Sequence, residues 1–351
     1  MQVHTNEPFD VPNTTFGVAG VAYDPAPGLK QPSSATFDPA VHLCYEEPVN
    51  KYTFEDLGIP AKGICPIAIT EAFPLFTREA VRELRKDCLS SKVLDDFLVS
   101  SPLAAGQSRE FHPSVAPFAC AAFSSPEFVA ACSKAAGIEL VPVMPLELAH
   151  TNYQMGAGGK AALRLLSEEP STPFPPAETM PEDDGTSVVG WHHDAYPFVA
   201  VTMLSDVKNM IGGETAIQKG DGSIAKIRGP DLGWTVVMQG RYVRHLACKA
   251  YNAKERITMV TSFRAKDVSL PDESLLETIR PITKKNRINA QWSIYRLRLV
   301  AERMNKLAQQ LEDDSKDDVY AEKDVCNPES MQKFVDEQMR YLHYGIKEMM
   351  A

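Results

Sequence analysis

"GWHHDAYPF", residues 190–198, places two histidines and an aspartate side by side in an otherwise apolar segment. The β-branched and aromatic residues around it predict an extended strand. Side chains of a strand alternate between its two faces, so His192 and Asp194 share one face and His193 points to the other. An H-x-D pair on one face offers two ligands to a metal ion, and it needs a third ligand from elsewhere in the sheet.

The third ligand is predicted to be His245, in "GRYVRHLA". Of the eight histidines, it is the one on a later predicted strand of the same region. Two imidazoles and a carboxylate form a facial triad that leaves coordination positions open and suits non-haem Fe(II). Zinc with the same ligands is an alternative, but zinc hydrolases with such a set usually carry H-E-x-x-H on a helix, and that motif is absent. Because a lone strand histidine is more often structural than a ligand, the assignment depends on the rest of the site.

An arginine completes the pattern. Arg256 follows His245 after "LACKAYNAKE", which we interpret as a hairpin with its turn at Tyr251–Asn252. Residue 245 then pairs with residue 258, and Arg256 and Thr258 share the face of His245. A guanidinium can grip a carboxylate through two hydrogen bonds, which indicates an anionic organic ligand beside the metal. The alternative is a surface charge paired with the neighbouring Glu255.

The wider pattern predicts a mainly β protein with flanking helices. Short strands with turn signals recur between residues 138 and 264, and no helix-length segment interrupts 188–264, which favours an antiparallel sandwich or barrel over a βαβ fold. Thr77 is the predicted N-cap of a helix to about Val99. Ser125, Pro126 and Gly137 delimit a second helix. After residue 270 the chain is helical again, with Asn327 as the N-cap of the last helix.

We expect one compact unit built from three segments. These are an irregular and helical N-terminal region (1–140), a β catalytic core (141–268) and a C-terminal helical region (269–351) whose helices are a candidate homodimer contact. The acidic, proline-rich segment 167–187 is expected to be a long loop, which is either a solvated insertion or a lid that closes over bound substrate.

The composition of the chain limits the kinds of partner that it can bind. The chain has 351 residues, 44% of them hydrophobic, and a formal net charge of -10, which disfavours sequence-independent nucleic-acid binding. No apolar run approaches the roughly 20 residues that cross a bilayer, and the first residues do not form a secretory signal. The seven cysteines are odd in number and lack CxxC spacing, so we expect a reduced, cytoplasmic protein.

The set H-x-D at 192–194, His245 and Arg256 resembles the signature of Fe(II)/2-oxoglutarate-dependent dioxygenases. The segment "VTMLSDVKNMIGGETAI" (201–217) is similar to the prolyl-hydroxylase-like branch. "HTNYQMGAGG" (150–159) resembles the strand before the H-x-D, whose tyrosine often touches 2-oxoglutarate, and that tyrosine is Tyr153. The resemblance covers about residues 146–266, and the long loop 167–187 departs from the family pattern. A looser likeness is to fungal secondary-metabolite tailoring oxygenases.

The resemblance implies a double-stranded β-helix, a cupin-like jelly roll. Fe(II) would be held by His192, Asp194 and His245, and 2-oxoglutarate by Arg256 with Thr258 and Tyr153. The implied activity is O2-dependent oxidation of a small-molecule substrate, by hydroxylation, desaturation or ring closure, with formation of succinate and CO2 and with ascorbate as a reductant in vitro. Arg244 and Arg264 are the substitutes for Arg256. Two alternatives stay open: a zinc-dependent hydrolase or lyase on a cupin-like barrel, and an inactive binding module of the same fold.

Overall fold

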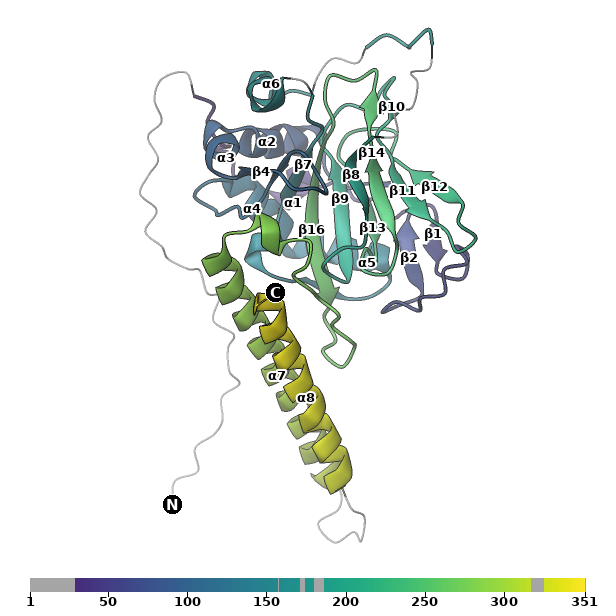
Figure 1. Cartoon of the computed structure of the whole chain (residues 1–351), viewed down its shortest axis with the longest axis vertical. Helices are drawn as coiled ribbons and strands as arrows, with labels where there is room; N and C mark the ends of the chain where they lie inside the picture. Colours follow the sequence, from purple (N-terminus) through teal and green to yellow (C-terminus); the bar gives the residue numbers. More distant parts are fainter. Residues whose placement is uncertain (1–28, 157, 171–173, 180–185, 317–324, 351) are drawn as a thin grey trace.

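The computed structural model describes residues 29–156, 158–170, 174–179, 186–316 and 325–350 (Figure 1). These residues form antiparallel sheets flanked by helices, which confirms the predicted mainly β architecture. The strands are β1 (Lys51–Thr53), β2 (Ile67–Thr70), β3 (Phe73–Pro74), β4 (Leu98–Val99), β5 (Gln107–Ser108), β6 (Leu140–Pro142), β7 (His150–Tyr153), β8 (Ser187–His192), β9 (Phe198–Met203), β10 (Ile211–Gly212), β11 (Thr215–Gln218), β12 (Ile224–Ile227), β13 (Trp234–Met238), β14 (His245–Cys248), β15 (Ala250–Tyr251) and β16 (Ile257–Ala265). The helices are α1 (Pro39–His42), α2 (Arg78–Cys88), α3 (Ser91–Asp96), α4 (Pro117–Ser124), α5 (Pro126–Ala136), α6 (Gly159–Leu165), α7 (Lys285–Lys316) and α8 (Pro328–Met350), with 3-10 turns η1 (Pro145–Glu147) and η2 (Arg280–Ile282).

Two sheets face each other across a cavity. The larger sheet has the order β1-β2-β13-β9-β16-β7-β5-β4, with β3 and β6 on side branches, and the smaller has the order β12-β11-β14-β8. Residues of β7, β9, β13 and β16 from the first sheet and of β8, β11 and β14 from the second line the cavity. The opposite face of the larger sheet carries the main hydrophobic core, where Leu84, Phe118 and Phe128 of α2, α4 and α5 pack with Ala200 and Phe263.

The N-terminal region is part of this architecture. Strands β1, β2 and β5 extend the larger sheet on both sides, so the expected segment boundary at residue 140 does not separate two sheets. The described parts of the expected lid, 167–187, are attached to the body: backbone oxygens of Ser167 and Glu168 accept hydrogen bonds from Arg85. Residues 171–173 and 180–185 of this segment lie outside the described residues, and the lid role stays a prediction.

The predicted helix signals are confirmed with one correction. Thr77 caps α2 by accepting a hydrogen bond from the Ala80 backbone, but α2 ends at Cys88 instead of continuing to Val99. Ser90 interrupts the helix because its hydroxyl accepts a hydrogen bond from the Val93 backbone and starts α3. Ser125 caps α5, and Gly137 ends it with a φ of 71°, a left-handed conformation that glycine adopts without strain.

The C-terminal helices α7 and α8 form an antiparallel hairpin that projects from the body (Figure 1). Its base packs on the body through an apolar cluster that includes Ile288, Trp292 and Leu299 with Tyr196 and Leu276. None of the described helices is both long and apolar enough to cross a membrane.

A fully buried arginine ties four segments together behind the larger sheet. The Arg85 guanidinium donates hydrogen bonds to the backbone oxygens of Leu204, Ser167 and Glu168, and its Nη1 lies 2.5 Å from Oε1 of the buried Glu255. This ion pair fixes the residue directly before Arg256. Removing one partner of a buried pair leaves an uncompensated charge, which costs far more than losing a surface pair.

We therefore expect Arg85→Met to lower the free energy of unfolding by roughly 3–5 kcal/mol. The measurement is urea unfolding followed by circular dichroism. Arg82→Met is the matched control on the same helix: the Arg82 side chain is 40% exposed, pairs with Glu169 on the surface, and shares the buried Glu83 with Lys86, so its loss should cost about 1 kcal/mol or less. Equal losses for the two variants would contradict this account of Arg85.

Candidate metal centre and anion site

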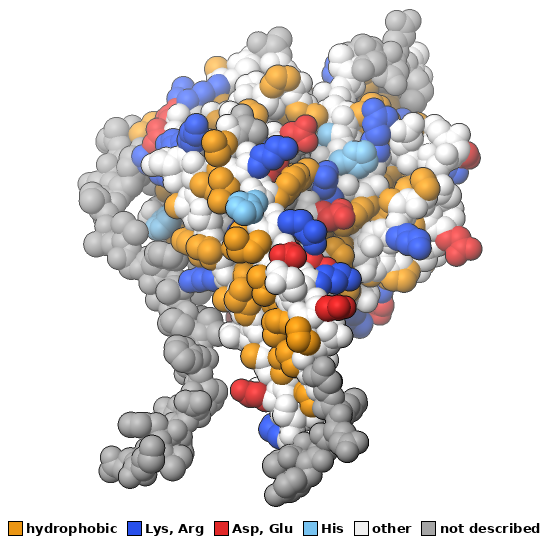
Figure 2. Space-filling model, turned by 60° about the horizontal axis from the view of Figure 1, so that its bottom comes forward, with side chains coloured by type: hydrophobic (Ala, Val, Ile, Leu, Met, Phe, Trp, Pro, Cys, Tyr) orange, Lys and Arg blue, Asp and Glu red, His pale blue; other side chains and the backbone are white. Residues whose placement is uncertain are grey.

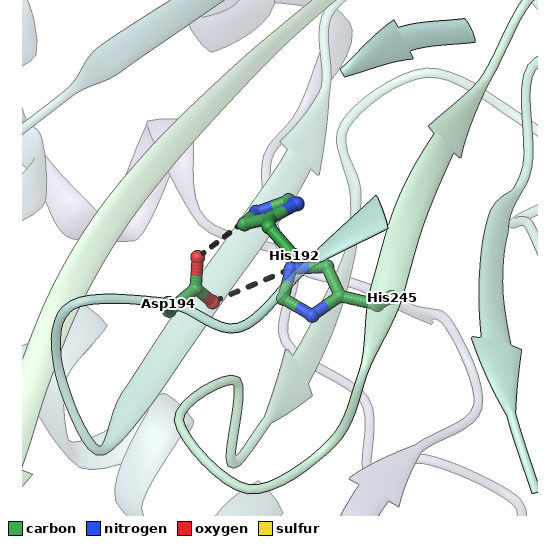
Figure 3. Close-up of side chains that lie close together, drawn as sticks. All are labelled: His192, Asp194 and His245. Carbon is green, nitrogen blue, oxygen red and sulfur yellow. Dashed lines mark ion pairs between the residues drawn. The ribbon is translucent and has the colours of Figure 1, made fainter. Parts of the chain in front are cut away.

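The three predicted ligands meet in the cavity. One ligand atom from each of His192, Asp194 and His245 lies within 4.8 Å of the others (Figure 3). Nε2 of His192 is 3.3 Å from Oδ1 of Asp194, and Nε2 of His245 is 3.5 Å from Oδ2. His193 is exposed and does not line the cavity, as the alternation of faces predicts.

Strand pairing brings the histidines together. His192 at the end of β8 is the register partner of His245 at the start of β14, and their ring centroids are 4.2 Å apart. β8 ends at His192, so Asp194 is not a strand residue as the prediction assumed. Its position is fixed by a hydrogen bond from its backbone N–H to the Gly240 oxygen at 2.9 Å, which returns the carboxylate to the histidine side.

Backbone hydrogen bonds orient both imidazoles. Nδ1 of His192 lies 2.7 Å from the Gly190 oxygen, and Nδ1 of His245 lies 2.8 Å from the Val243 oxygen. A carbonyl oxygen only accepts, so each Nδ1 carries the proton and donates it. Each Nε2 then keeps a lone pair directed at Asp194, which is how proteins usually prepare a histidine for a metal.

The carboxylate between these rings lacks donors of its own. Oδ2 of Asp194 is buried and has no hydrogen-bond partner among the described residues. Gly240 makes room for it, because a Cβ there would lie 1.7 Å from Oδ2. A buried acceptor facing two imidazole lone pairs is costly unless a cation lies between them. The residues thus fit a divalent metal ion.

The charges of the site suit such an ion. Burial raises the pKa of Asp194, but the neighbouring His245 and His192 lower it by a larger amount. The net pKa is therefore below its usual value, and the carboxylate is ionised at neutral pH. Burial lowers the pKa of His245 to about 4 and keeps this ring neutral. For His192, burial lowers the pKa, but the neighbouring Asp194 carboxylate raises it by more, so the pKa lies above its usual value. A bound metal would compete with that proton.

Arg256 and Thr258 line the same cavity. Nε of Arg256 donates to the Gly213 oxygen at 3.1 Å, and Nη1 lies 3.5 Å from Oγ1 of Thr258. Burial lowers the pKa of Arg256 to about 10, so the side chain remains a cation at neutral pH. Within the described residues no carboxylate lies at ion-pair distance from it. Glu255, which the alternative interpretation pairs with Arg256 on the surface, is buried and pairs with Arg85 instead.

The predicted hairpin register is wrong, although its two residues reach the site. β14 pairs with β8 and β11, whereas β16 pairs with β9, β7 and β6 in the other sheet. His245 and Thr258 therefore lie on opposite sides of the cavity and not side by side on one face. The two substitute arginines lie elsewhere: Arg244 is exposed and donates to Gln218, and Arg264 pairs with Glu302.

The structure does not bring Tyr153 to the cavity. Its hydroxyl donates to the Cys88 oxygen at 2.7 Å and lies 2.7 Å from Oγ of Ser108, within the core on the opposite face of β7. The predicted contact with 2-oxoglutarate is not compatible with this position. Asn152, the register partner of Thr258, faces the cavity instead.

Besides Thr215, three polar residues of the cavity escaped the sequence analysis. The Gln107 amide donates to Oδ1 of Asn152 at 3.2 Å and lies 3.3 Å from Nε2 of His150. Burial, then the positive charge of Arg109, lower the pKa of His150 to about 3, so its ring is neutral. Alternation along β7 could have identified His150 and Asn152, because both lie opposite to Tyr153. No local signal marks Gln107, which belongs to a strand of two residues.

Comparisons with known proteins give distant likenesses. No protein-family model and no curated protein matches the chain. Among solved structures it is similar to a Pseudomonas putida prolyl-4-hydroxylase (16% identity, 54% of this chain and 88% of that chain, TM-score 0.32). It is also similar to a 2OG-Fe(II) oxygenase family oxidoreductase from Burkholderia pseudomallei (16% identity, 48% and 63%, TM-score 0.29) and to IDO from Bacillus thuringiensis (21% identity, 22% and 37%, TM-score 0.19). At these TM-scores a function has to be assigned from the residues of the site.

His192 faces the cavity and the adjacent His193 does not, which gives a direct test of metal binding. We expect His192→Ala to lose Fe(II) binding and His193→Ala to keep it, because only the first ring faces Asp194. Anaerobic titration calorimetry with Fe(II) measures both variants. The reverse result would show that His193 is the ligand and that the β8–β14 register is different.

Gly240 provides a second test that leaves every ligand in place. A methyl group at this position displaces the Asp194 carboxylate, so Gly240→Ala should weaken Fe(II) binding by roughly 10- to 100-fold, as changes beside metal ligands do. Gly156→Ala is the matched control, since a Cβ there has no atom within 4 Å. Unchanged iron affinity in Gly240→Ala, with a native circular dichroism spectrum in both variants, would remove Asp194 from the ligand set.

Proposed function

We propose that this protein is an Fe(II)- and 2-oxoglutarate-dependent oxygenase that oxidises an unactivated C–H bond of a small molecule, on a double-stranded β-helix core. The observation that carries the proposal is Arg256. It is a buried cation with no carboxylate partner among the described residues, and it lines the same cavity as the cluster of His192, Asp194 and His245. A dicarboxylate co-substrate would use both features, because one end of it can bind the metal held by the triad and its other carboxylate can bind Arg256.

Each group has a defined task. The two imidazoles and Asp194 would hold Fe(II) on one side and leave positions open for co-substrate and O2. When bound, the iron supplies O2 activation coupled to oxidative decarboxylation of 2-oxoglutarate to succinate and CO2. Arg256, with the hydroxyl of Thr258 beside it, would hold the distal carboxylate by charge-assisted hydrogen bonds.

The remaining lining orients the reactants and excludes water. Apolar side chains from both sheets form much of the wall, among them Val189, Val199 and Val260. Gln107, His150 and Asn152 provide uncharged hydrogen-bonding groups at the same cavity. Such neutral groups suit hydroxyl, carbonyl or amide functions of a substrate or of the co-substrate.

A zinc-dependent hydrolase or lyase with the same three ligands is the second candidate, and an inactive binding module is the third. The ligand cluster is compatible with all three. Neither rival gives Arg256 a specific task, whereas an anchored dicarboxylate does.

The deciding experiment is an assay for succinate formation with anaerobically purified protein, Fe(II), ascorbate, 2-oxoglutarate and a metabolite extract, followed by mass spectrometry. The proposal expects succinate formation that requires both Fe(II) and O2 and that Asp194→Ala abolishes. Activity that is supported by Zn(II) without O2 or 2-oxoglutarate would establish a hydrolase or lyase. Iron binding with no succinate above the Asp194→Ala background would indicate the inactive module.

The anchor makes a quantitative prediction. Loss of a bidentate, charge-assisted contact costs on the order of 2–4 kcal/mol, so Arg256→Ala should raise the 2-oxoglutarate requirement by roughly 30- to 1,000-fold while Fe(II) binding persists. Arg244→Ala is the control, because Arg244 lies outside the cavity. An unchanged apparent KM for 2-oxoglutarate in Arg256→Ala would exclude this residue as the anchor.

A further inference from the structure

The projecting α7–α8 hairpin carries hydrophobic side chains that nothing in the described chain covers. Figure 2 shows hydrophobic side chains along the hairpin between the body and its tip. Leu297 is 58% exposed and Ile346 is 53% exposed. The large apolar residues of the hairpin that are exposed are Ile294, Leu297, Met304, Val335, Met339, Tyr344, Ile346 and Met350.

All of these residues except Tyr344 belong, together with Ala301, Ala308 and Leu342, to one seam on each helix. In α7 the seam is Ile294, Leu297, Ala301, Met304 and Ala308, at alternating spacings of three and four residues. In α8 it is Val335, Met339, Leu342, Ile346 and Met350, at spacings of four, three, four and four. Apolar residues with this heptad spacing line up along one side of a helix and are typical of helices that pack on other helices.

The two seams lie on the same side of the hairpin. The helices touch each other through Trp292 and Arg303 of α7 and Gly345 and Gln338 of α8. Residues on one side of this contact, such as Leu299 of α7, pack on the body. At about 100° per residue, both seams fall on the other side of the contact, away from the body. They form one apolar surface, which we call the outer face of the hairpin.

The hairpin is held rigidly enough to present this face. The Arg296 guanidinium lies 4.3 Å from the Trp292 ring and 3.9 Å from the Tyr341 ring, between the two helices. The indole N–H of Trp292 donates to the Gly345 oxygen at 3.0 Å. Stacked cations and a buried hydrogen bond fix the relative position of α7 and α8 before any partner binds.

Charges beside the α8 seam identify the occupant. Glu329 and Asp336 lie in the half of α8 near the tip, and Arg340 and Lys347 lie in the half near the body. All four are exposed, and within the described residues none of them makes an ion pair. They share one side of the helix next to the seam. The acidic pair and the basic pair are mirror images of each other about residue 338, whereas Lys333, on the same side between the two acids, has His343 at its mirror position.

The apolar seam has the same symmetry. When α8 is laid antiparallel on a copy of itself with the centre near residue 338, Glu329 lies opposite Lys347 and Asp336 lies opposite Arg340. Val335 then lies opposite Leu342, within one residue, and Met339 lies beside its own copy. A seam whose apolar spacing and flanking charges both match those of its own antiparallel copy is what an isologous two-fold interface requires.

We propose that the outer face binds a second copy of this chain, with the two hairpins antiparallel in a four-helix bundle. α7 fits the same axis: Arg298 near the body and Glu312 near the tip flank its seam, symmetrically about residue 305. Arg303 of α7 hydrogen-bonds Gln338 of α8, so the centres of both helices lie at nearly the same level of the hairpin. The two bodies are then at opposite ends of the bundle. The proposal is independent of the proposed oxygenase activity.

The test uses the full chain and analytical ultracentrifugation. Wild type should sediment with twice the chain mass of 38.7 kDa, and Leu342→Glu should sediment as a monomer. Leu165→Glu is the matched control, because Leu165 is 82% exposed on α6 and should leave the dimer intact. Circular dichroism verifies that each variant is folded. A wild-type chain that stays monomeric up to about 0.1 mM overturns the proposal and leaves the face to a different partner.

Charge reversal tests the antiparallel register. Arg340→Glu with Lys347→Glu makes the flank mainly acidic, with Lys333 as the remaining base, and Glu329→Lys with Asp336→Lys makes it basic. Each double variant alone should dimerise at least about tenfold more weakly than wild type, and an equimolar mixture of the two should form a heterodimer of wild-type affinity. Reversed variants that dimerise normally, or a mixture that does not recover, would contradict this register.

Discussion

The pairing of His192 with His245 across β8 and β14 is the constraint on which the site depends. A slip of one residue in either strand would turn one imidazole out of the cavity, since side chains alternate between faces. The same register exposes His193. Because β8 ends at His192, the chain can then turn so that Gly240 holds the backbone of Asp194 and leaves space for its carboxylate. One strand pair and one glycine thus place all three ligand atoms.

The buried arginines show how unusual Arg256 is. Arg85 pairs with Glu255, Arg109 pairs with Glu147, and Arg296 stacks between two aromatic rings. Each buried charge is compensated within the chain, as stability requires. Arg256 donates to one carbonyl oxygen and lies near one hydroxyl; no described carboxylate lies at ion-pair distance from it, although Glu214, from farther away, partly offsets the lowering of its pKa by burial. The fold compensates three buried arginines with its own groups and leaves the fourth beside a cavity. This difference favours a bound ligand as the anion that pairs with Arg256.

The sequence predicted what local geometry controls. Caps at Thr77 and Ser125 and the left-handed Gly137 are confirmed because each depends on neighbours within a few residues. His192 and Asp194 reach the cavity as predicted, but Asp194 lies beyond the end of β8 and is placed by a hydrogen bond to Gly240. The supposed hairpin before Arg256 was wrong because short chain separation does not determine pairing: β14 and β16 enter opposing sheets through partners far away in sequence. Tyr153 was misassigned for the same reason, since the face of β7 that meets the cavity is set by its pairing with β16.

Charge balance connects the two halves of the site. Among the described residues that line the cavity, Asp194 and Arg256 are ionised at neutral pH, His150 and His245 are held neutral by burial, and His192 is neutral when it binds a metal. A divalent metal alone would leave the cavity with an excess of two positive charges, and a dicarboxylate alone would leave an excess of negative charge. Metal and dicarboxylate together bring it to neutrality. In a cavity walled by valines, this difference should make each ligand bind more tightly when the other is present. The remaining space is then bounded by neutral polar groups and apolar side chains, which favours an uncharged region of the substrate next to the metal.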